Sequence, residues 1–495
     1  MTLEEARARI DSINENLVKL LSERFDVVKE IGEYKKQNNL PVYDEARENA
    51  VIEKVTSLAP DEYKAPISWV FKIIMSESRA LETENTLFGV VGKSVSSSFS
   101  PFIHHLLGNT SYKTISVPET EIEDFIKSRK FNGINITMPY KKLVFSLCDV
   151  VSDTAKALKN VNVVVNKNGV LYGDNTDFYG MRFALETAGI EIKNKKVLIL
   201  GSGGASATAQ YLCKNLSAAS VSVVSRKGAL NYENVYADRE DTEVIINCTP
   251  VGMGGDFRSC LIDLEKFGHL ESVFDCVYLP VRTSLILKAE DLGLKACGGL
   301  PMLVAQAVKA SELFGFKAPD VLEILKEVRK KTEIISLIGM SGSGKSTVAS
   351  SINEDAPDSD KIIEKLLKKS IPEIFNERGE PYFRAVETAA INIALDEAFA
   401  LDGYKVLSVG GGAVLDEENM LSLRHEGPVV FLDRDVSALD KSGRPLAKDD
   451  ETVKKLFEAR LPLYKKYSDF TVNNDSSVAS AAKKIKEAFD EITCY

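Results

Sequence analysis

The sequence predicts a multidomain chain that begins with an all-α domain and continues with α/β domains. At 495 residues the chain is too long for a single hydrophobic core, and its length favours about three domains. Residues 1–85 contain almost no glycine, and their apolar residues recur at helical spacing. From residue 87 onward, short apolar runs rich in β-branched residues alternate with helical patterns, which is typical of largely parallel sheets.

Charge and composition exclude several classes of function. The net charge of −10 and the absence of a dense Lys/Arg cluster argue against nucleic acid or an anionic membrane as the main partner. The 7 cysteines form no C-x-x-C pair and only 4 histidines are present, so we expect reduced thiols and no structural zinc site. The N-terminus lacks the features of a secretory leader and no apolar run approaches about 18 residues. We therefore expect a cytoplasmic protein that acts on small molecules.

In the helical domain, three cations interrupt one apolar face of a long first helix. Steps of three and four residues from Arg7 reach Arg24 and Lys35, and the last two fall about 20° apart on the helix. Buried cations need an anionic partner, which is either a ligand or the glutamates of neighbouring helices. Beyond Pro41, further polar side chains converge on the same helices, namely Asp44, Arg47, Glu48, Ser78 and Glu82.

Over nearly its whole length this domain resembles the all-helical chorismate mutase family. The resemblance rests on R-x-x-I, L-L-S-E-R, a following lysine and P-V-x-D-x-x-R-E. It implies rearrangement of chorismate to prephenate, and a homodimer in which Arg7 reaches the partner's site. The implied contacts to the carboxylates and ether oxygen are Arg7, Arg24, Lys35 and Arg47, and those to the hydroxyl and ring are Asp44, Glu48 and Ser78. Because the reaction has no nucleophile, catalysis would come from conformational restriction and electrostatic stabilisation.

A glycine-rich turn in the central region follows an apolar strand-like run and precedes a helical pattern. Its residues are Gly201, Gly203, Gly204 and Ala205, at the place where a pyrophosphate meets a helix N-terminus. The next strand ends at Ser225, Arg226 and Lys227, without an acidic residue for a ribose 2′-hydroxyl. The two cations suit a 2′-phosphate, which favours NADP(H) over NAD. A tight turn without a ligand is the alternative.

The motifs around this turn resemble shikimate dehydrogenase over roughly residues 87–325. They include S-F-S-P-F-I-H, N-I-T-M-P-Y-K, G-D-N-T-D, N-C-T-P-V-G-M and D-C-V-Y-L-P. The resemblance implies NADPH-dependent reduction of 3-dehydroshikimate to shikimate, with Lys141 and Asp177 as the acid/base pair. The implied substrate contacts are Ser98, Ser100, Thr137, Asn162, Asp177, Tyr278 and Gln306. The segment V-N-V at Asn162 departs from the A-V-N-T that relatives more often show.

A complete G-x-x-x-x-G-K-S at residues 339–346 directly follows the apolar run 334–338 and precedes a helical pattern. In that context it predicts a phosphate-binding loop. The backbone at Gly339, Gly342 and Gly344 would approach the phosphates of ATP. Lys345 would reach the β/γ oxygens, and Ser346, next to Thr347, suits Mg²⁺. A chance match to a glycine-rich turn is the alternative.

Residues 332–495 resemble shikimate kinase through G-E-P-Y-F-R, G-G-G, G-R-P-L and R-L-P-L-Y behind this loop. The resemblance implies Asp360, Arg384, Gly411 and Arg460 as shikimate contacts, with Asp360 orienting or deprotonating the attacking hydroxyl. It also implies Asp358 as a Mg²⁺ ligand and Arg444 as a mobile-lid residue on the ATP phosphates. Only 12 residues separate Lys345 from Asp358, fewer than a first helix and a second strand require.

The expected architecture is therefore an all-α domain, an α/β substrate domain with a Rossmann-like NADP domain, and an α/β P-loop kinase domain. Their expected limits are 1–85, 86–185 completed by 300–330, 186–299, and 332–495. The expected cofactors are NADP(H), ATP and Mg²⁺. Two alternatives remain. In the first, the helical domain is a dimerising sensor of chorismate or prephenate. In the second, the dehydrogenase–kinase pair acts on quinate or another hydroxy acid.

Mutase activity should rise toward acid pH. Position 82 often carries glutamine in chorismate mutases, where the amide donates to the ether oxygen, whereas this chain has Glu82. A carboxyl group donates a hydrogen bond only when it is protonated. The check is the pH–rate profile for chorismate turnover, and a profile that is flat between about pH 5 and 8 would contradict the expectation.

Overall fold

The computed structural model describes residues 2–38, 45–82, 87–96, 98–167, 169–254, 258–317, 319–439 and 450–492. It separates into two compact units. One comprises Met1–Thr176 and Ala307–Pro319, and the other Asp177–Gln306 and Asp320–Tyr495. The sequence-based domain limits cut the chain at other points and stay a prediction. Within the described ranges, no helix is both long and apolar enough to cross a membrane.

The N-terminal region is a three-helix arrangement of α1 (Leu3–Gln37), α2 (Glu45–Ser57) and α3 (Lys64–Glu82). The first helix starts with a capping box, in which Glu5 N donates to Thr2 Oγ1 at 3.2 Å and Thr2 N donates to Glu5 Oε2 at 2.7 Å. The third helix packs on both of the others. Among the described residues of this region, Val28 is the one buried hydrophobic side chain.

The first unit also contains a six-stranded mixed sheet in the order β2-β1-β3-β5-β6-β4. Strand β1 pairs in parallel with β2 and β3, whereas β5 pairs antiparallel with β3 and β6. The strands are β1 (Phe88–Gly92), β2 (Lys113–Ser116), β3 (Gly133–Ile136), β4 (Val150–Val151), β5 (Val163–Lys167) and β6 (Val170–Asp174). The connecting helices are α4 (Ser100–Leu106), α5 (Ile122–Lys127), α6 (Lys141–Phe145) and α7 (Asp153–Leu158).

The second unit holds two fully parallel sheets. The first has the order β11-β10-β9-β7-β8. Its strands are β7 (Lys196–Leu200), β8 (Ser220–Val224), β9 (Val244–Asn247), β10 (Ser272–Asp275) and β11 (Lys295–Cys297). The helices of this part are α8 (Asp177–Thr187), α9 (Gly204–Asn215), α10 (Val235–Asp238), α11 (Ser284–Asp291) and α12 (Leu300–Leu313), and α12 continues into the first unit.

The other parallel sheet has the order β13-β12-β14-β15. Its strands are β12 (Ile334–Ile338), β13 (Lys405–Ser408), β14 (Val429–Asp433) and β15 (Phe470–Asn473). The helices are α13 (Val321–Thr332), α14 (Lys345–Ile352), α15 (Ser359–Leu367), α16 (Ile371–Phe399), α17 (Glu417–Glu426), α18 (Asp450–Tyr467) and α19 (Val478–Glu491). The helix α16 is kinked at Gly379, where φ is 76°.

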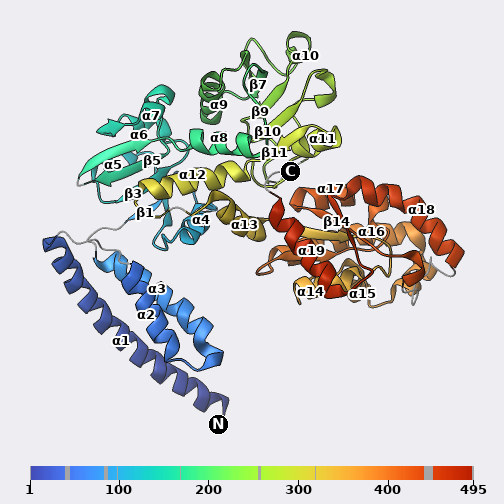
Figure 1. The fold of residues 1–495 in the computed structure, drawn as a ribbon, viewed down its shortest axis with the longest axis horizontal. Helices are drawn as coiled ribbons and strands as arrows, with labels where there is room; N and C mark the ends of the chain where they lie inside the picture. The colour runs from blue at the N-terminus through green and yellow to red at the C-terminus, as the bar shows by residue number, and fades with distance from the viewer. Residues whose placement is uncertain are drawn as a thin grey trace. The chain divides into compact units, whose positions relative to one another are not determined.

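Strand β12 is buried on both faces, which explains why its sequence is a continuous apolar run. Ile335 and Leu337 pack against α14 and α19. Ile334 and Ile338 point to the opposite face and belong to the core that includes residues of α16 and α17. Figure 1 shows these helices around the sheet. The alternation of side chains along a strand thus divides one apolar segment between two hydrophobic layers.

Candidate functional site

The G-x-x-x-x-G-K-S segment forms the turn between β12 and α14. Gly344 has a φ of 93°, a conformation that a residue with a Cβ rarely adopts, and α14 begins directly after it. Lys345 is buried, and its Nζ donates to the carbonyls of Gly339 and Met340, each at 2.9 Å. Asn474 Nδ2 holds the turn from the end of β15 by donating to Ser343 O at 2.7 Å. The structure thus places the predicted phosphate loop at a helix N-terminus.

A hydroxyl and a carboxylate meet beside this loop. Ser346 Oγ donates to Asp358 Oδ2, and Ser408 Oγ lies 3.5 Å from Ser346 Oγ. Asp358 is buried and also caps α15, because its Oδ1 accepts from Asp360 N at 2.9 Å. Its backbone makes a single parallel bridge to Ser408. The short segment after α14 therefore reaches the sheet edge with one bridge, and it still brings Asp358 to Ser346.

This pair fits a divalent cation by its chemistry. Carboxylate, hydroxyl and phosphate oxygens are the ligands that Mg²⁺ prefers, and the remaining positions are usually filled by water and nucleotide phosphates. Thr347, the next residue of the motif, has an exposed side chain. The expected ligands Ser346 and Asp358 are thus adjacent, whereas Arg444 lies outside the described residues.

Two carboxylates lie against the glycine-rich segment that follows β13. A Cβ on Gly410 would stand 2.7 Å from both Asp360 Oδ1 and Glu387 Oε1, so only a glycine fits between them. Burial, together with the charge of Asp358, raises the pKa of Asp360 to about 7. Burial also raises the pKa of Glu387. These groups make a concentrated acidic site at the carboxyl ends of parallel strands.

Arginines complete this site from two helices. Arg384 Nη1 donates to Glu387 Oε2 at 2.6 Å, and Glu387 is 1% exposed. Arg460 is buried, and its Nη1 donates to Gly411 O at 3.0 Å. Glu387 was not among the residues predicted from the sequence. The signal was its position three residues after Arg384 on one helix, a spacing at which opposite charges pair.

In the first unit, the predicted dehydrogenase residues gather at one edge of the mixed sheet. Ser98 and Ser100 follow β1, and Ser98 Oγ donates to Ser100 Oγ at 3.2 Å. Thr137 follows the neighbouring strand β3, and a Cβ on Gly92 at the end of β1 would stand 2.6 Å from its methyl group. Lys141 begins α6 after the same strand. Carboxyl ends of neighbouring parallel strands meet at one edge, which explains this grouping.

Asn162 is buried at the same edge and is held in one orientation. Its Nδ2 donates to Thr176 Oγ1 at 3.1 Å, and its Oδ1 accepts from Thr176 N at 2.7 Å. Its carbonyl accepts from Ile136 N at 2.7 Å. The departure from the usual A-V-N-T segment therefore leaves Asn162 fixed between the ends of β3 and β6.

Three predicted substrate residues belong to the second unit. Asp177 begins α8, and Gly180 on that helix packs against Gln306 of α12, because a Cβ there would stand 3.0 Å from Gln306 Cβ. Gln306 Nε2 donates to Leu303 O at 2.9 Å. Tyr278 follows β10 and is partly buried, and this burial raises its pKa.

The glycine turn after β7 leaves room for a ligand. Apart from the adjacent residues and the backbone of α9, no atom lies within 4 Å of a Cβ built on Gly203 or Gly204, and α9 begins at Gly204. Ala205 lies in the first turn of that helix, and Gly201 has a φ of 99°. At the end of β8, Ser225 is partly buried and both Arg226 and Lys227 are exposed. An open helix N-terminus beside two cations fits a dinucleotide with an additional phosphate.

In the helical region the structure brings two of the predicted residues together. Arg24 Nη1 of α1 donates to Ser78 Oγ of α3, and Arg24 Nη2 lies 3.0 Å from Met75 Sδ. Arg7 and Arg47 are exposed, and Lys35 and Glu48 are partly buried. Glu82 is the last residue of α3, and Asp44 lies outside the described residues.

Comparison with known families divides the chain in the same way. Family models match for chorismate mutase type II at residues 6–83, for the shikimate dehydrogenase substrate binding domain at 90–164, and for shikimate kinase at 341–490.

The relatives that we compared match about half of the chain. The NADP(+) shikimate dehydrogenase of Caldicellulosiruptor bescii is 32% identical over 272 residues, which are 49% of this chain and 94% of that protein. The enzyme of the same name from Thermococcus kodakarensis is 36% identical over 260 residues, 48% of this chain and 94% of that protein. A solved chorismate mutase/shikimate 5-dehydrogenase fusion from Clostridium acetobutylicum is 30% identical, with a TM-score of 0.47, and covers 50% of this chain and 99% of its own.

The coverage of these dehydrogenases is nearly complete on their side. The chain therefore belongs to the shikimate dehydrogenase family, and it carries a chorismate mutase type II domain before the dehydrogenase and a shikimate kinase domain after it.

Proposed function

We propose that this chain carries out two consecutive reactions on one compound and a third on chorismate. The dehydrogenase part reduces 3-dehydroshikimate to shikimate with NADPH, and the kinase part phosphorylates shikimate with ATP to shikimate 3-phosphate. The helical part rearranges chorismate to prephenate. The single observation that carries the two-step proposal is the Ser346–Asp358 contact beside the Asp360–Glu387–Arg384 cluster, in a chain of the dehydrogenase family.

In the kinase part, the residues divide between the nucleotide and the acceptor. The phosphate loop and Lys345 bind the ATP phosphates, and Ser346 and Asp358 would hold Mg²⁺, which supplies neutralisation of charge on the transferred phosphoryl group. Arg384 and Arg460 suit the shikimate carboxylate because a guanidinium binds carboxylates in a bidentate manner. Glu387 keeps Arg384 oriented through the 2.6 Å hydrogen bond. Asp360 orients the attacking hydroxyl or takes its proton.

In the dehydrogenase part, the two serines and Thr137 bind substrate at the sheet edge, and Asn162 presents a fixed amide. NADPH supplies the hydride. Reduction of a ketone creates an alkoxide that needs a proton, and the Lys141 ammonium gives it while the Asp177 carboxylate holds a ring hydroxyl. The cytoplasmic location and the use of small molecules alone as partners, without nucleic acid or membrane, belong to the same proposal.

In the mutase part, Arg24 and Ser78 form the nucleus of a polar site between α1 and α3. We propose that the site is completed in a homodimer. Exposed apolar residues recur along α1 at alternating steps of three and four, except that the position between Leu20 and Val27 is Arg24. They are Ile10, Ile13, Leu17, Leu20, Val27 and Ile31. This spacing is that of the a and d positions of a coiled-coil seam. Among the described residues of the three helices, Val28 is the one buried hydrophobic side chain. A second copy packed on this face would therefore supply the hydrophobic core that the single chain lacks.

A coupled assay tests the two-step proposal. Purified protein with NADPH, 3-dehydroshikimate, ATP and Mg²⁺ should oxidise NADPH and release shikimate 3-phosphate in equal molar amounts. The checks are absorbance of NADPH and mass analysis of the product. Dehydrogenase activity without phosphorylation would overturn the kinase assignment, and faster turnover of quinate in both assays would favour another hydroxy acid.

Replacing Gly412 with alanine should weaken binding of the acceptor. A Cβ at this position would stand 2.2 Å from Arg384 Nη1 and 2.5 Å from Arg384 Nη2, so the guanidinium must move. The KM for shikimate should rise by about tenfold or more, corresponding to about 1.4 kcal/mol, while NADPH oxidation stays unchanged. Gly268→Ala is the control, since no atom lies within 4 Å of its Cβ. An unchanged KM in Gly412→Ala would show that Arg384 does not contact the acceptor.

A charge in the exposed seam should separate the subunits. Leu17 is 50% exposed, and a glutamate there would be buried without a partner in the dimer. Leu17→Glu should halve the mass measured by light scattering and reduce chorismate turnover, with the kinase rate unchanged. Leu58→Glu, at a position that is 77% exposed outside the seam, should behave as wild type. A wild-type protein that is dimeric and turns over no chorismate, but changes its other rates when chorismate is added, would identify a sensor module.

A further inference from the structure

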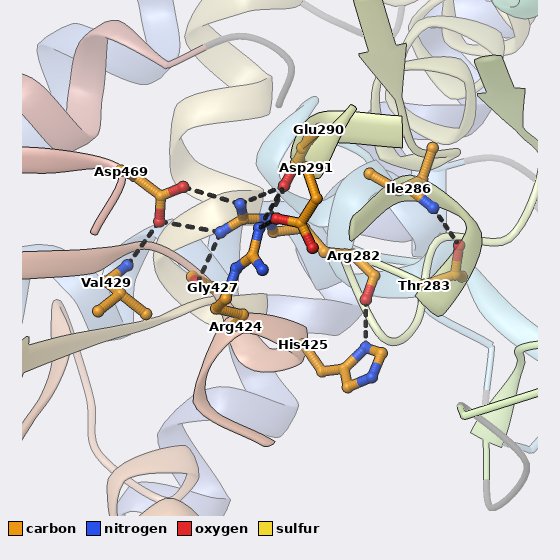
Figure 2. Close-up of polar contacts among 10 residues, drawn as sticks. All are labelled: Arg282, Thr283, Ile286, Glu290, Asp291, Arg424, His425, Gly427, Val429 and Asp469. Carbon is orange, nitrogen blue, oxygen red and sulfur yellow. Dashed lines mark hydrogen bonds and ion pairs between the residues drawn. The ribbon is translucent and has the colours of Figure 1, made fainter. Parts of the chain in front are cut away.

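The NADP-binding part and the kinase part of the second unit meet over a buried arginine (Figure 2). Arg282 lies between β10 and α11 and is 1% exposed. Its Nη1 donates to Asp469 Oδ2 at 2.9 Å, and its Nη2 donates to Asp469 Oδ1 at 2.7 Å. Its Nε donates to Glu290 Oε1 at 3.2 Å, so one guanidinium joins a carboxylate of each part. Bidentate pairs of this kind fix orientation as well as distance.

Further groups contact Arg282 and the carboxylates at the end of α11. Arg424 Nη2, in the last turn of α17, lies 2.9 Å from Asp291 Oδ1 and 3.4 Å from Glu290 Oε2 at the end of α11. His425 Nδ1 donates to Arg282 O, and Arg282 N donates to His425 O at 3.4 Å. Arg282 Nη1 also donates to Gly427 O at 3.4 Å. The side chain and the backbone of Arg282 therefore both bind the kinase part.

Each end of this cluster is continuous with a predicted nucleotide or substrate loop. On the kinase side, Asp469 Oδ2 also accepts from Val429 N at 2.7 Å, so the carboxylate joins the starts of β14 and β15. At the other end of β15, Asn474 donates to the carbonyl of Ser343 in the phosphate loop at 2.7 Å. A displaced Asp469 would therefore loosen the strand whose far end holds this loop.

On the NADP side, the residue after Arg282 contacts a second carboxylate that joins two neighbouring strands. Thr283 Oγ1 donates to Asp275 Oδ2 at 2.7 Å and caps α11. Asp275 Oδ1 accepts from Asn247 Nδ2 and from Val277 N, each at 2.9 Å. The carboxylate thus joins the ends of β9 and β10, and the loop after β10 leads to Tyr278.

We propose that Arg282 locks the NADP-binding part and the kinase part into one cooperative folding unit, so that a nucleotide bound to either part protects both. The surface around Arg282 on the NADP-binding part thus has the kinase part of the same chain as its partner. The side chains of Glu290 and Asp469 are only 16% and 20% exposed, and loss of the buried guanidinium would leave these two like charges close together without their shared cation. A state in which the guanidinium has lost one carboxylate while water is still excluded carries that penalty, so we expect the two parts to separate together.

Hydrogen exchange on the full-length chain tests this inference. In wild type, NADP⁺ should slow exchange in peptides from β12–β15 as well as β7–β11, and a non-hydrolysable ATP analogue with Mg²⁺ should do the same in reverse. In Arg282→Met, each nucleotide should protect only its own part, and calorimetry should resolve two transitions where the wild-type second unit shows one. Should Arg282→Met fail to fold, Asp469→Asn removes one charge of the pair at nearly constant size and should give the same separation.

Arg258→Ala is the matched control. The Arg258–Glu418 ion pair joins the same two parts at 2.5 Å, but its side chains are 54% and 57% exposed. Exposed pairs contribute little, so this variant should keep the wild-type response to both nucleotides.

The inference uses the nucleotides of the proposed function as probes. A nucleotide that protects neither part of the wild type counts against that function. Protection confined to its own part in wild type, or a wild-type response in the Arg282 or Asp469 variant, overturns the inference.

Discussion

The constraint on which the α/β sites depend is the direction of parallel strands. Strands that run the same way end at the same edge of a sheet, so residues far apart in the sequence meet there. In the kinase part, the loops after β12 and β13 bring the phosphate loop to Gly411, where a Cβ would stand 2.7 Å from Ser341 N. In the first unit, the same constraint brings Thr137, which follows β3, to Gly92 at the end of β1. The direction of the strands thus determines which residues meet at each site.

The shortened segment before Asp358 shows how little of a strand this constraint requires. A complete second strand would need several residues in a ladder, but a single bridge from Asp358 to Ser408 fixes the backbone beside β13. The side chain then caps α15 and accepts from Ser346, so one carboxylate starts a helix and contacts the phosphate loop. The contact between Asp358 and Ser346 is therefore formed without a full strand ladder at this edge.

The parts of the fold and the site that could be predicted from the sequence are those written in local patterns. The run 334–338, the glycines after it and Lys345 lie within one short segment, and their spacing alone indicates a strand, a turn and a helix N-terminus. The position of Asp358 next to Ser346 depends on a loop whose path no local pattern describes. Glu387 could be predicted only in part. Its spacing from Arg384 is visible in the sequence, but nothing there shows that this face of the helix is buried against Gly410.

Two buried arginines of the second unit also differ in whether their partners could be predicted from the local sequence. Arg329 pairs with Glu333 one helical turn away at 2.7 Å, and it also donates to Phe489 O of α19 at 2.6 Å. The pair with Glu333 follows a spacing that a sequence displays, and the hydrogen bond to Phe489 O joins α13 to α19. Arg282 pairs with Asp469, which lies 187 residues further along the chain, directly before β15, so this contact cannot be anticipated from the sequence around Arg282. Breaking a buried pair typically costs about 3–5 kcal/mol, most of it from the charge left behind. Neither part holds the cluster alone, because Arg282 and Glu290 come from one part and Asp469 from the other, so its contribution to stability depends on their contact.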